Sequence, residues 1–179
     1  ASIYFQLIQR MAKRIDDMSA GRLKVEVLPA GAIVPVFEIL DAVDKGIVNG
    51  GFAWTHYWSG KHPAGLLFSA PTAGLGFGLD QIGTMSWLYD GGGNELYQEY
   101  WTKILGYNIR GFLCMPMGPE PFGWFKKPFK NLEELKKMKF RSPPGIPSES
   151  FKALGIPAVS MPGGEIVPSA QRGVIDAAE

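Results

Sequence analysis

Between residues 135 and 145 the chain reads Leu135-Lys-Lys-Met-Lys-Phe-Arg141-Ser-Pro-Pro-Gly145. The segment Lys139-Phe-Arg141 predicts a short strand, and the Pro-Pro-Gly that follows predicts a turn into a new helix. In α/β proteins, small ligands bind in the crevice outside the carboxyl ends of strands. A guanidinium there offers a rigid fork of donors that matches a carboxylate. We therefore interpret Arg141 as the anchor of a carboxylate ligand; a surface ion pair is the alternative.

Helical and strand-like segments alternate along the rest of the chain, and this pattern predicts an α/β fold with a mostly parallel sheet flanked by helices. The first helix begins near residue 1 and ends at residues 19–21. Further helices are expected over residues 36–46, 81–89, 94–105, 131–138, 147–154 and 165–171. Strands are expected over residues 23–28, 50–54, 108–114, 122–125, 139–141, 158–160 and 174–179.

The Pro- and Gly-rich loop at residues 115–121 interrupts this alternation and predicts two lobes. We assign residues 1–116 to lobe I and residues 117–179 to the first part of lobe II. A cleft between lobes joined in this way closes by a hinge motion in periplasmic binding proteins. The helical pattern starts with no signal peptide before it, and the last strand stops at Glu179. We therefore expect a fragment that is incomplete at both ends.

Composition excludes some classes of protein. The chain has 179 residues, 46% of them hydrophobic and 20% charged, with a formal net charge of +1. No run of Lys or Arg exceeds two residues, so the sequence gives no sign of nucleic-acid binding. His56 and His62 are the only histidines, and no nucleophile motif accompanies them, so no catalytic residue is assigned and an enzyme is not expected. The single cysteine, Cys114, lies in an apolar run and is expected to be buried.

Three segments resemble the extracytoplasmic solute receptors of tripartite ATP-independent periplasmic (TRAP) transporters. They are Leu40-Asp-Ala-Val-Asp-Lys-Gly46 together with Tyr57-Trp58, the loop 118–124, and residues 139–179. The likeness covers nearly the whole chain and is greatest to the branch that binds 2-oxo and 2-hydroxy monocarboxylates. It implies a two-lobed, periplasmic-binding-protein-like fold and a receptor that hands a small organic acid to membrane permease subunits. A periplasmic location and, as one option, a homodimer follow from the same resemblance. It also implies that the opening strand of lobe I and the remainder of lobe II are missing from the chain.

The resemblance also implies roles for individual residues. Arg141 would clamp the carboxylate of the ligand. Glu120, where these receptors usually carry an amide, would touch both ligand and metal, and its extra negative charge favours a divalent cation. Glu179 would help to hold a Na⁺ or Ca²⁺ that bridges to the ligand. Tyr57 and Trp58 would line the ligand pocket.

Other interpretations stay open at this point. Glu120 could be a solvated loop carboxylate, Tyr57 and Trp58 could be core aromatics, and Glu179 could be a frayed end. A second function is an α/β enzyme that acts on a carboxylate substrate, with Arg141 as anchor and Glu120 as general base. A third is a structural domain without a small ligand. A receptor would show ligand-dependent thermal stabilisation and no turnover of 2-oxo acids.

Overall fold

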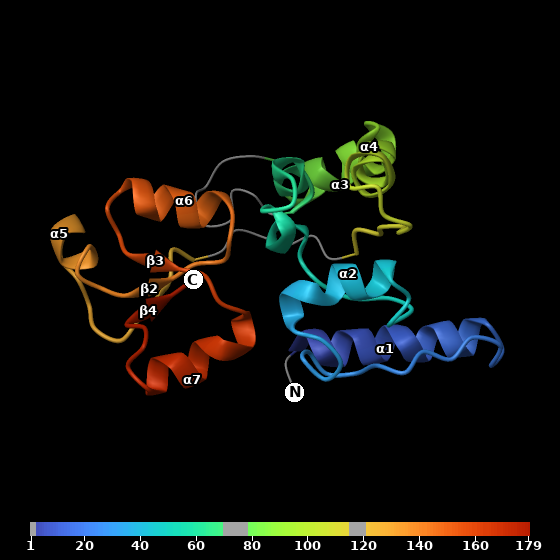
Figure 1. The fold of residues 1–179 in the computed structure, drawn as a ribbon, viewed down its shortest axis with the longest axis horizontal. Helices are drawn as coiled ribbons and strands as arrows, with labels where there is room; N and C mark the ends of the chain where they lie inside the picture. Colours follow the sequence, from blue (N-terminus) through green and yellow to red (C-terminus); the bar gives the residue numbers. More distant parts are fainter. Residues whose placement is uncertain (1–2, 70–78, 115–120) are drawn as a thin grey trace.

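A computed structural model describes residues 3–69, 79–114 and 121–179 of the chain (Figure 1). We call residues 3–114 the N-terminal part and residues 121–179 the C-terminal part, because each holds a separate hydrophobic core. The N-terminal part contains the helices α1 (Ile3–Met18), α2 (Ile39–Asp44), α3 (Gln81–Asp90) and α4 (Gly93–Glu99). Short 3₁₀ helices cover Val36–Glu38, Thr55–Trp58 and Pro63–Phe68, and a π-helix covers Tyr100–Ile104.

The core of the N-terminal part is aromatic. Phe68 lies 4.9 Å from Tyr97, and Tyr100 lies 4.7 Å from Trp101, both measured between ring centroids. Tyr100 is fully buried. The expected helix over residues 94–105 is helical throughout, but from Tyr100 it widens into the π-helix. The rings of Tyr100 and Trp101 are thereby buried in the same core.

A parallel sheet organises the C-terminal part. Its strands β1 (Trp124–Phe125), β2 (Phe140–Arg141), β3 (Ala158–Val159) and β4 (Ala177–Ala178) lie in the order β1-β4-β2-β3. The central strand β2 runs parallel to both β3 and β4, whereas β1 is antiparallel to β4. The helices are α5 (Leu132–Leu135), α6 (Ile146–Ala153) and α7 (Ile166–Gln171), with a 3₁₀ turn at Gly163–Glu165. Figure 1 shows α6 and α7 on opposite faces of the sheet.

Local sequence explains this arrangement. The side chain of Asn131 accepts a hydrogen bond of 3.0 Å from the Glu134 N–H and caps α5, as its residue type predicts. Phe140 on β2 is fully buried against Phe151 of α6, with ring centroids 4.5 Å apart. Because β2, β3 and β4 are parallel, their carboxyl ends lie at one edge of the sheet. Figure 1 places this edge, marked by the C-terminus, toward the N-terminal part.

Three expected strands are wrong for the described structure. Residues 23–28, 50–54 and 108–114 belong to no strand, and the sheet formed by the described residues lies wholly within 124–178. Extended backbone becomes a strand only where a neighbouring segment pairs with its N–H and C=O groups. Alternation of polar and apolar residues does not supply that neighbour. Cys114, expected to be buried in one of these strands, is exposed.

A substitution at Gly111 tests the packing of the aromatic core. A Cβ atom there would lie 2.2 Å from Trp101 Nε1 and 2.5 Å from Tyr97 Cε1. The Gly111 backbone cannot easily retreat, because its N–H and C=O are both bonded to the side chain of Gln98, at 3.1 and 2.8 Å. We expect Gly111→Ala to lower the free energy of unfolding by about 1–3 kcal/mol in chemical denaturation. Gly50→Ala is the control, since a Cβ there meets nothing within 4 Å; equal losses in both variants would contradict the prediction.

Candidate functional site

Arg141 ends β2 at the edge of the sheet that faces the N-terminal part. Its side chain donates through Nε and Nη2 to the Met161 carbonyl, at 3.2 and 3.0 Å, and through Nη1 to the Glu179 carbonyl, at 2.5 Å. Met161 follows β3 and Glu179 follows β4, so the two flanking strands hold the guanidinium with main-chain oxygens. Only 6% of Arg141 is exposed, and it is the one charged residue in the buried core of the chain as described. Such a fixed, sheltered guanidinium is suited to recognising a carboxylate.

Glu179 lies beside Arg141 at the end of β4. Its backbone N–H donates to the Arg141 carbonyl at 3.1 Å, in continuation of the β2–β4 pairing. Its side-chain Oε2 accepts a hydrogen bond of 2.9 Å from the hydroxyl of Ser142, which is fully buried. Glu179 is therefore held at the end of β4 by two contacts. Its backbone pairs with Arg141, and its carboxylate is bonded to Ser142, the next residue along the chain.

Tyr57 and His56 reach the site from the 3₁₀ helix Thr55–Trp58 of the N-terminal part. Their rings meet edge to face, with centroids 5.0 Å apart, and Tyr57 also packs edge to face on Phe37 at 4.9 Å. Burial raises the pKa of Tyr57, while the positive charge of Arg141 opposes that rise. Burial, aided by the same charge, lowers the pKa of His56 to about 4. Arg141 thus lies within electrostatic reach of both side chains, and the two parts of the molecule contribute to one site.

Close packing joins the two parts next to this site. Gly145 has φ +109° and ψ −151°, a conformation essentially restricted to glycine. A Cβ atom there would lie 2.6 Å from Leu66 Cδ2 and 3.9 Å from His56 Cβ. A groove of about 480 Å³ runs along the junction. Its walls are Ser59, Gly60 and Leu66 on one side and Gly145, Ile146, Glu149, Ser150 and Ala153 on the other.

Two of the predicted site residues are not brought to Arg141 by the described structure. Trp58 lies in the aromatic core, where its Nε1–H donates to the Phe37 carbonyl at 2.8 Å and its ring contacts Trp101 at 6.0 Å. This is the core role that the sequence left open for it. Glu120 lies outside the described residues.

Sequence reasoning missed His56 as a site residue. Its Nδ1 lies 2.6 Å from the hydroxyl of Ser69, thirteen residues further along the chain. The signal available in the sequence was its place directly before Tyr57, in Thr55-His-Tyr-Trp58. The pairing with Ser69 has no sequence signature.

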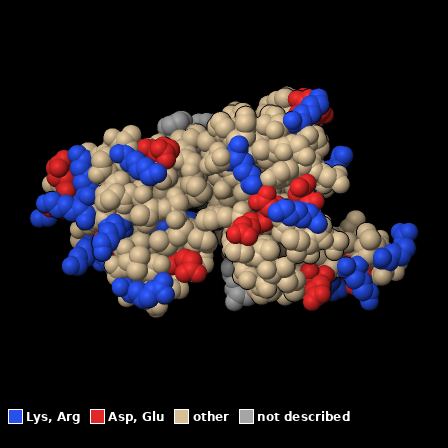
Figure 2. All heavy atoms as spheres, viewed as in Figure 1, with Lys and Arg blue, Asp and Glu red and all other residues tan. Residues whose placement is uncertain are grey.

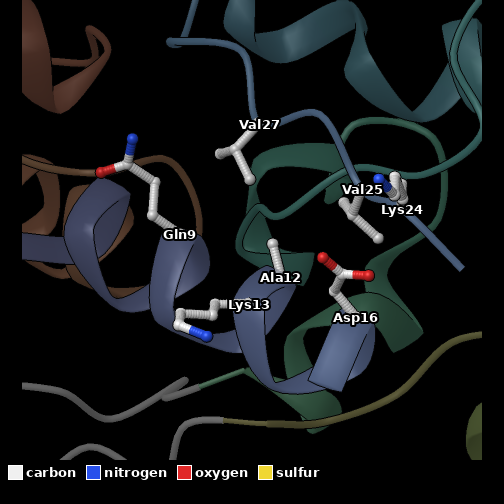
Figure 3. Close-up of a pocket in the computed structure, with 7 residues that line it drawn as sticks. All are labelled: Gln9, Ala12, Lys13, Asp16, Lys24, Val25 and Val27. Carbon is white, nitrogen blue, oxygen red and sulfur yellow. The ribbon is translucent and has the colours of Figure 1, made fainter. Parts of the chain in front are cut away.

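The surface elsewhere offers weaker candidates. Lys and Arg side chains gather at the end of the molecule where α5 lies, away from the sheet edge that carries Arg141 (Figures 1 and 2). A second groove, of about 390 Å³, lies between α1 and residues 24–27 (Figure 3). It is lined by Gln9, Ala12, Lys13, Asp16, Lys24, Val25 and Val27. Lys13 at its rim already pairs with Asp17, and both side chains are largely exposed. Neither region holds a buried charge.

The described residues fit a metal ion only in part. They contain no group of three or more His, Cys, Asp or Glu side chains that could hold one. Glu179 supplies one carboxylate, a hard oxygen donor of the kind that Na⁺ and Ca²⁺ accept. Within the same residues, no helix has the length and apolar character needed to cross a membrane.

A titration prediction follows from His56. Its pKa is about 4 in the folded chain, against an ordinary value of 6.5. As the pH falls from 6.5 toward 4, the unfolded chain takes up the proton first, so the free energy of unfolding decreases. We expect a loss of up to about 2 kcal/mol from this residue at about pH 5. Denaturation curves at neutral pH and at about pH 5 should differ less for His56→Phe than for the parent; an identical pH dependence in both would contradict the assignment.

Comparison with known proteins assigns the chain to a class. It belongs to the bacterial extracellular solute-binding proteins of family 7, DctP, whose family model matches residues 1–179. This confirms the resemblance noted from the sequence and places the chain among binding proteins rather than enzymes. A periplasmic protein of Nostoc sp. (strain PCC 7120) described as binding monocarboxylate 2-oxoacids is 37% identical over 171 residues, covering 96% of this chain and 45% of that protein.

Two solved structures are similar over the same region. A TRAP solute-binding protein from Bordetella bronchiseptica RB50, a dimer with copurified calcium and picolinate, superposes with a TM-score of 0.83 at 31% identity, covering 96% of this chain and 49% of that one. One from Pseudoalteromonas atlantica T6c, with bound sodium and pyruvate, gives 0.77 at 32% identity, covering 96% and 50%. The chain thus spans about half the length of the relatives it matches. The predicted α/β, periplasmic-binding-protein-like fold is confirmed over that half.

Proposed function

We propose that the protein is the solute receptor of a TRAP-type transporter, and that it captures a small 2-oxo or 2-hydroxy monocarboxylate in the periplasm. The observation that carries the proposal is Arg141, buried at the end of β2 and fixed by the carbonyls of Met161 and Glu179. A guanidinium held in one orientation presents a fork of donors that matches the two oxygens of a carboxylate. Tyr57, from the other part of the molecule, lies within electrostatic reach of the same guanidinium.

The proposal extends to the cleft and to a cation. Residues 1–116 and 117–179 are assigned to two lobes whose closure encloses the ligand. Glu179, together with Glu120 beyond the described residues, is proposed to help hold a Na⁺ or Ca²⁺ that bridges to the ligand. The two structural neighbours support this choice of ions, because one contains calcium and the other sodium beside a carboxylate. Membrane permease subunits are the expected partners, and a homodimer is one option for the assembly.

Cation removal is the direct test of this function. The protein, with whatever natural sequence flanks residues 1–179, is titrated with pyruvate in buffer that contains Na⁺ and Ca²⁺, and again after chelation in sodium-free buffer. We expect affinity to fall at least about tenfold without the cations, since the carboxylates of ligand and receptor then repel each other, and to recover when either ion is restored. Calorimetry gives the affinity and thermal shift gives an independent readout. If chelation leaves the affinity unchanged, the proposal of a bridging cation is wrong. If pyruvate does not bind in any buffer, the proposal of a 2-oxo-acid ligand is wrong.

A further inference from the structure

The His56–Ser69 pair is a polar unit that the proposed function does not yet use. The Nδ1 edge of the imidazole is held by the Ser69 hydroxyl at 2.6 Å. The face of the ring is fixed by Tyr57, whose ring stands at 87° to it. Within the described chain, the other ring nitrogen, Nε2, makes no hydrogen bond. One edge of the ring is therefore anchored and the opposite edge carries a polar atom with unused capacity.

The position of the pair links it to the ligand anchor. The charge of Arg141 acts on the imidazole, and the Gly145 backbone, four residues after Arg141, approaches the Cβ of His56. His56 belongs to the N-terminal part and Gly145 to the C-terminal part, and Gly145 also lines the groove along the junction. A small carboxylate held by the guanidinium would therefore extend its remaining atoms among side chains of the N-terminal part.

We propose that His56 is a specificity-determining residue, whose Nε2 hydrogen-bonds to the oxygen on C2 of the ligand while Ser69 sets the tautomer of the ring. The inference rests on the proposed function, because it presupposes a carboxylate on Arg141.

The hydrogen-bond chemistry lets the pair favour acids that carry an oxygen on C2, whether 2-oxo or 2-hydroxy, over acids that carry none. A 2-oxo oxygen only accepts, so it requires a proton on Nε2, which leaves Nδ1 as an acceptor for the Ser69 O–H. A 2-hydroxyl can donate, and it is equally served by the other tautomer, in which Nδ1–H donates to Ser69 Oγ. The serine hydroxyl rotates to suit either case. Burial keeps the imidazole neutral, so one ring nitrogen carries a proton while the other accepts.

Two ligands separate this role from a merely structural one. Pyruvate carries a C2 oxygen, and propionate is the same length of carboxylate without it. In the protein with its natural flanking sequence, we expect His56→Phe to weaken pyruvate binding about fivefold to tenfold and propionate binding less than twofold, because phenylalanine keeps the packing on Tyr57 but has no ring nitrogen. Ser69→Ala, which leaves the imidazole in place, should weaken pyruvate binding by a smaller factor in the same direction.

A spectroscopic readout measures the tautomer of His56 in the parent protein itself. Within residues 1–179 His62 is the only other histidine, and the ¹⁵N signals of His56 are identified by their absence from the spectrum of His56→Phe. Addition of pyruvate should drive His56 to the Nε2–H tautomer, and propionate should not. Two outcomes would overturn this inference and leave the proposed function standing. One is an equal loss of affinity for pyruvate and propionate in His56→Phe; the other is a His56 tautomer that does not change when pyruvate binds. Failure of the parent to bind either acid would overturn the proposed function, and the inference with it.

Discussion

Replacing Arg141 with lysine is expected to weaken binding of a 2-oxo acid by more than about tenfold, although the positive charge is kept. The guanidinium reaches two main-chain oxygens at once, Met161 O through Nε and Nη2 and Glu179 O through Nη1. A lysine ammonium is a single point donor on a flexible stem and cannot span both carbonyls while presenting an edge to the ligand. Titration calorimetry of the protein with its natural flanking sequence measures the loss.

Arg172→Lys is the matched control for this variant, because Arg172 is exposed in the same part of the molecule. Its affinity for the ligand should equal that of the parent. If Arg141→Lys also binds with the parent affinity, Arg141 is not part of the binding site.

Gly145→Ala is expected to destabilise the protein by about 1–3 kcal/mol. Two causes contribute: the backbone at φ +109° and ψ −151° is strained for any residue with a side chain, and the new Cβ would lie 2.6 Å from Leu66 Cδ2. The end of a leucine side chain can move aside, whereas the backbone cannot, because α6 begins at the next residue. Strain should therefore dominate.

A double-mutant comparison separates these causes. Leu66→Ala removes the atom that the new Cβ would meet, so the double variant should recover only the steric share of the loss in chemical denaturation. Complete recovery in the double variant would show that the contact with Leu66, and not the backbone conformation, determines the cost.

The C-terminal part was largely predictable because its signals are local. Asn131 predicts the start of α5, and Pro-Pro-Gly predicts the turn after β2. The position of Arg141 at a strand end follows from the residues beside it. Parallel alternation then brings Arg141 and Glu179 together without further information.

The N-terminal part was less predictable because its structure depends on partners distant in sequence. Residues 23–28 alternate as a strand does, yet alternation specifies the faces of a strand and not its neighbour. From the sequence, Tyr57 and Trp58 were equally good candidates for the ligand pocket and for the core. In a 3₁₀ helix, consecutive side chains diverge by about 120°, so Trp58 enters the core while Tyr57 packs beside it, within electrostatic reach of Arg141. The contact between His56 and Ser69 depends on how residues 56–69 fold back, which no local pattern encodes.

The anchoring of Arg141 by carbonyl oxygens has a consequence for redesign. Every residue type presents the same main-chain oxygen, so the side chain at position 161 can be exchanged without removing the group that orients the guanidinium. A library at Met161 would then vary the wall beside the carboxylate site while the anchor stays in place. Recognition of the acid group and choice among acids are, in this architecture, separately adjustable.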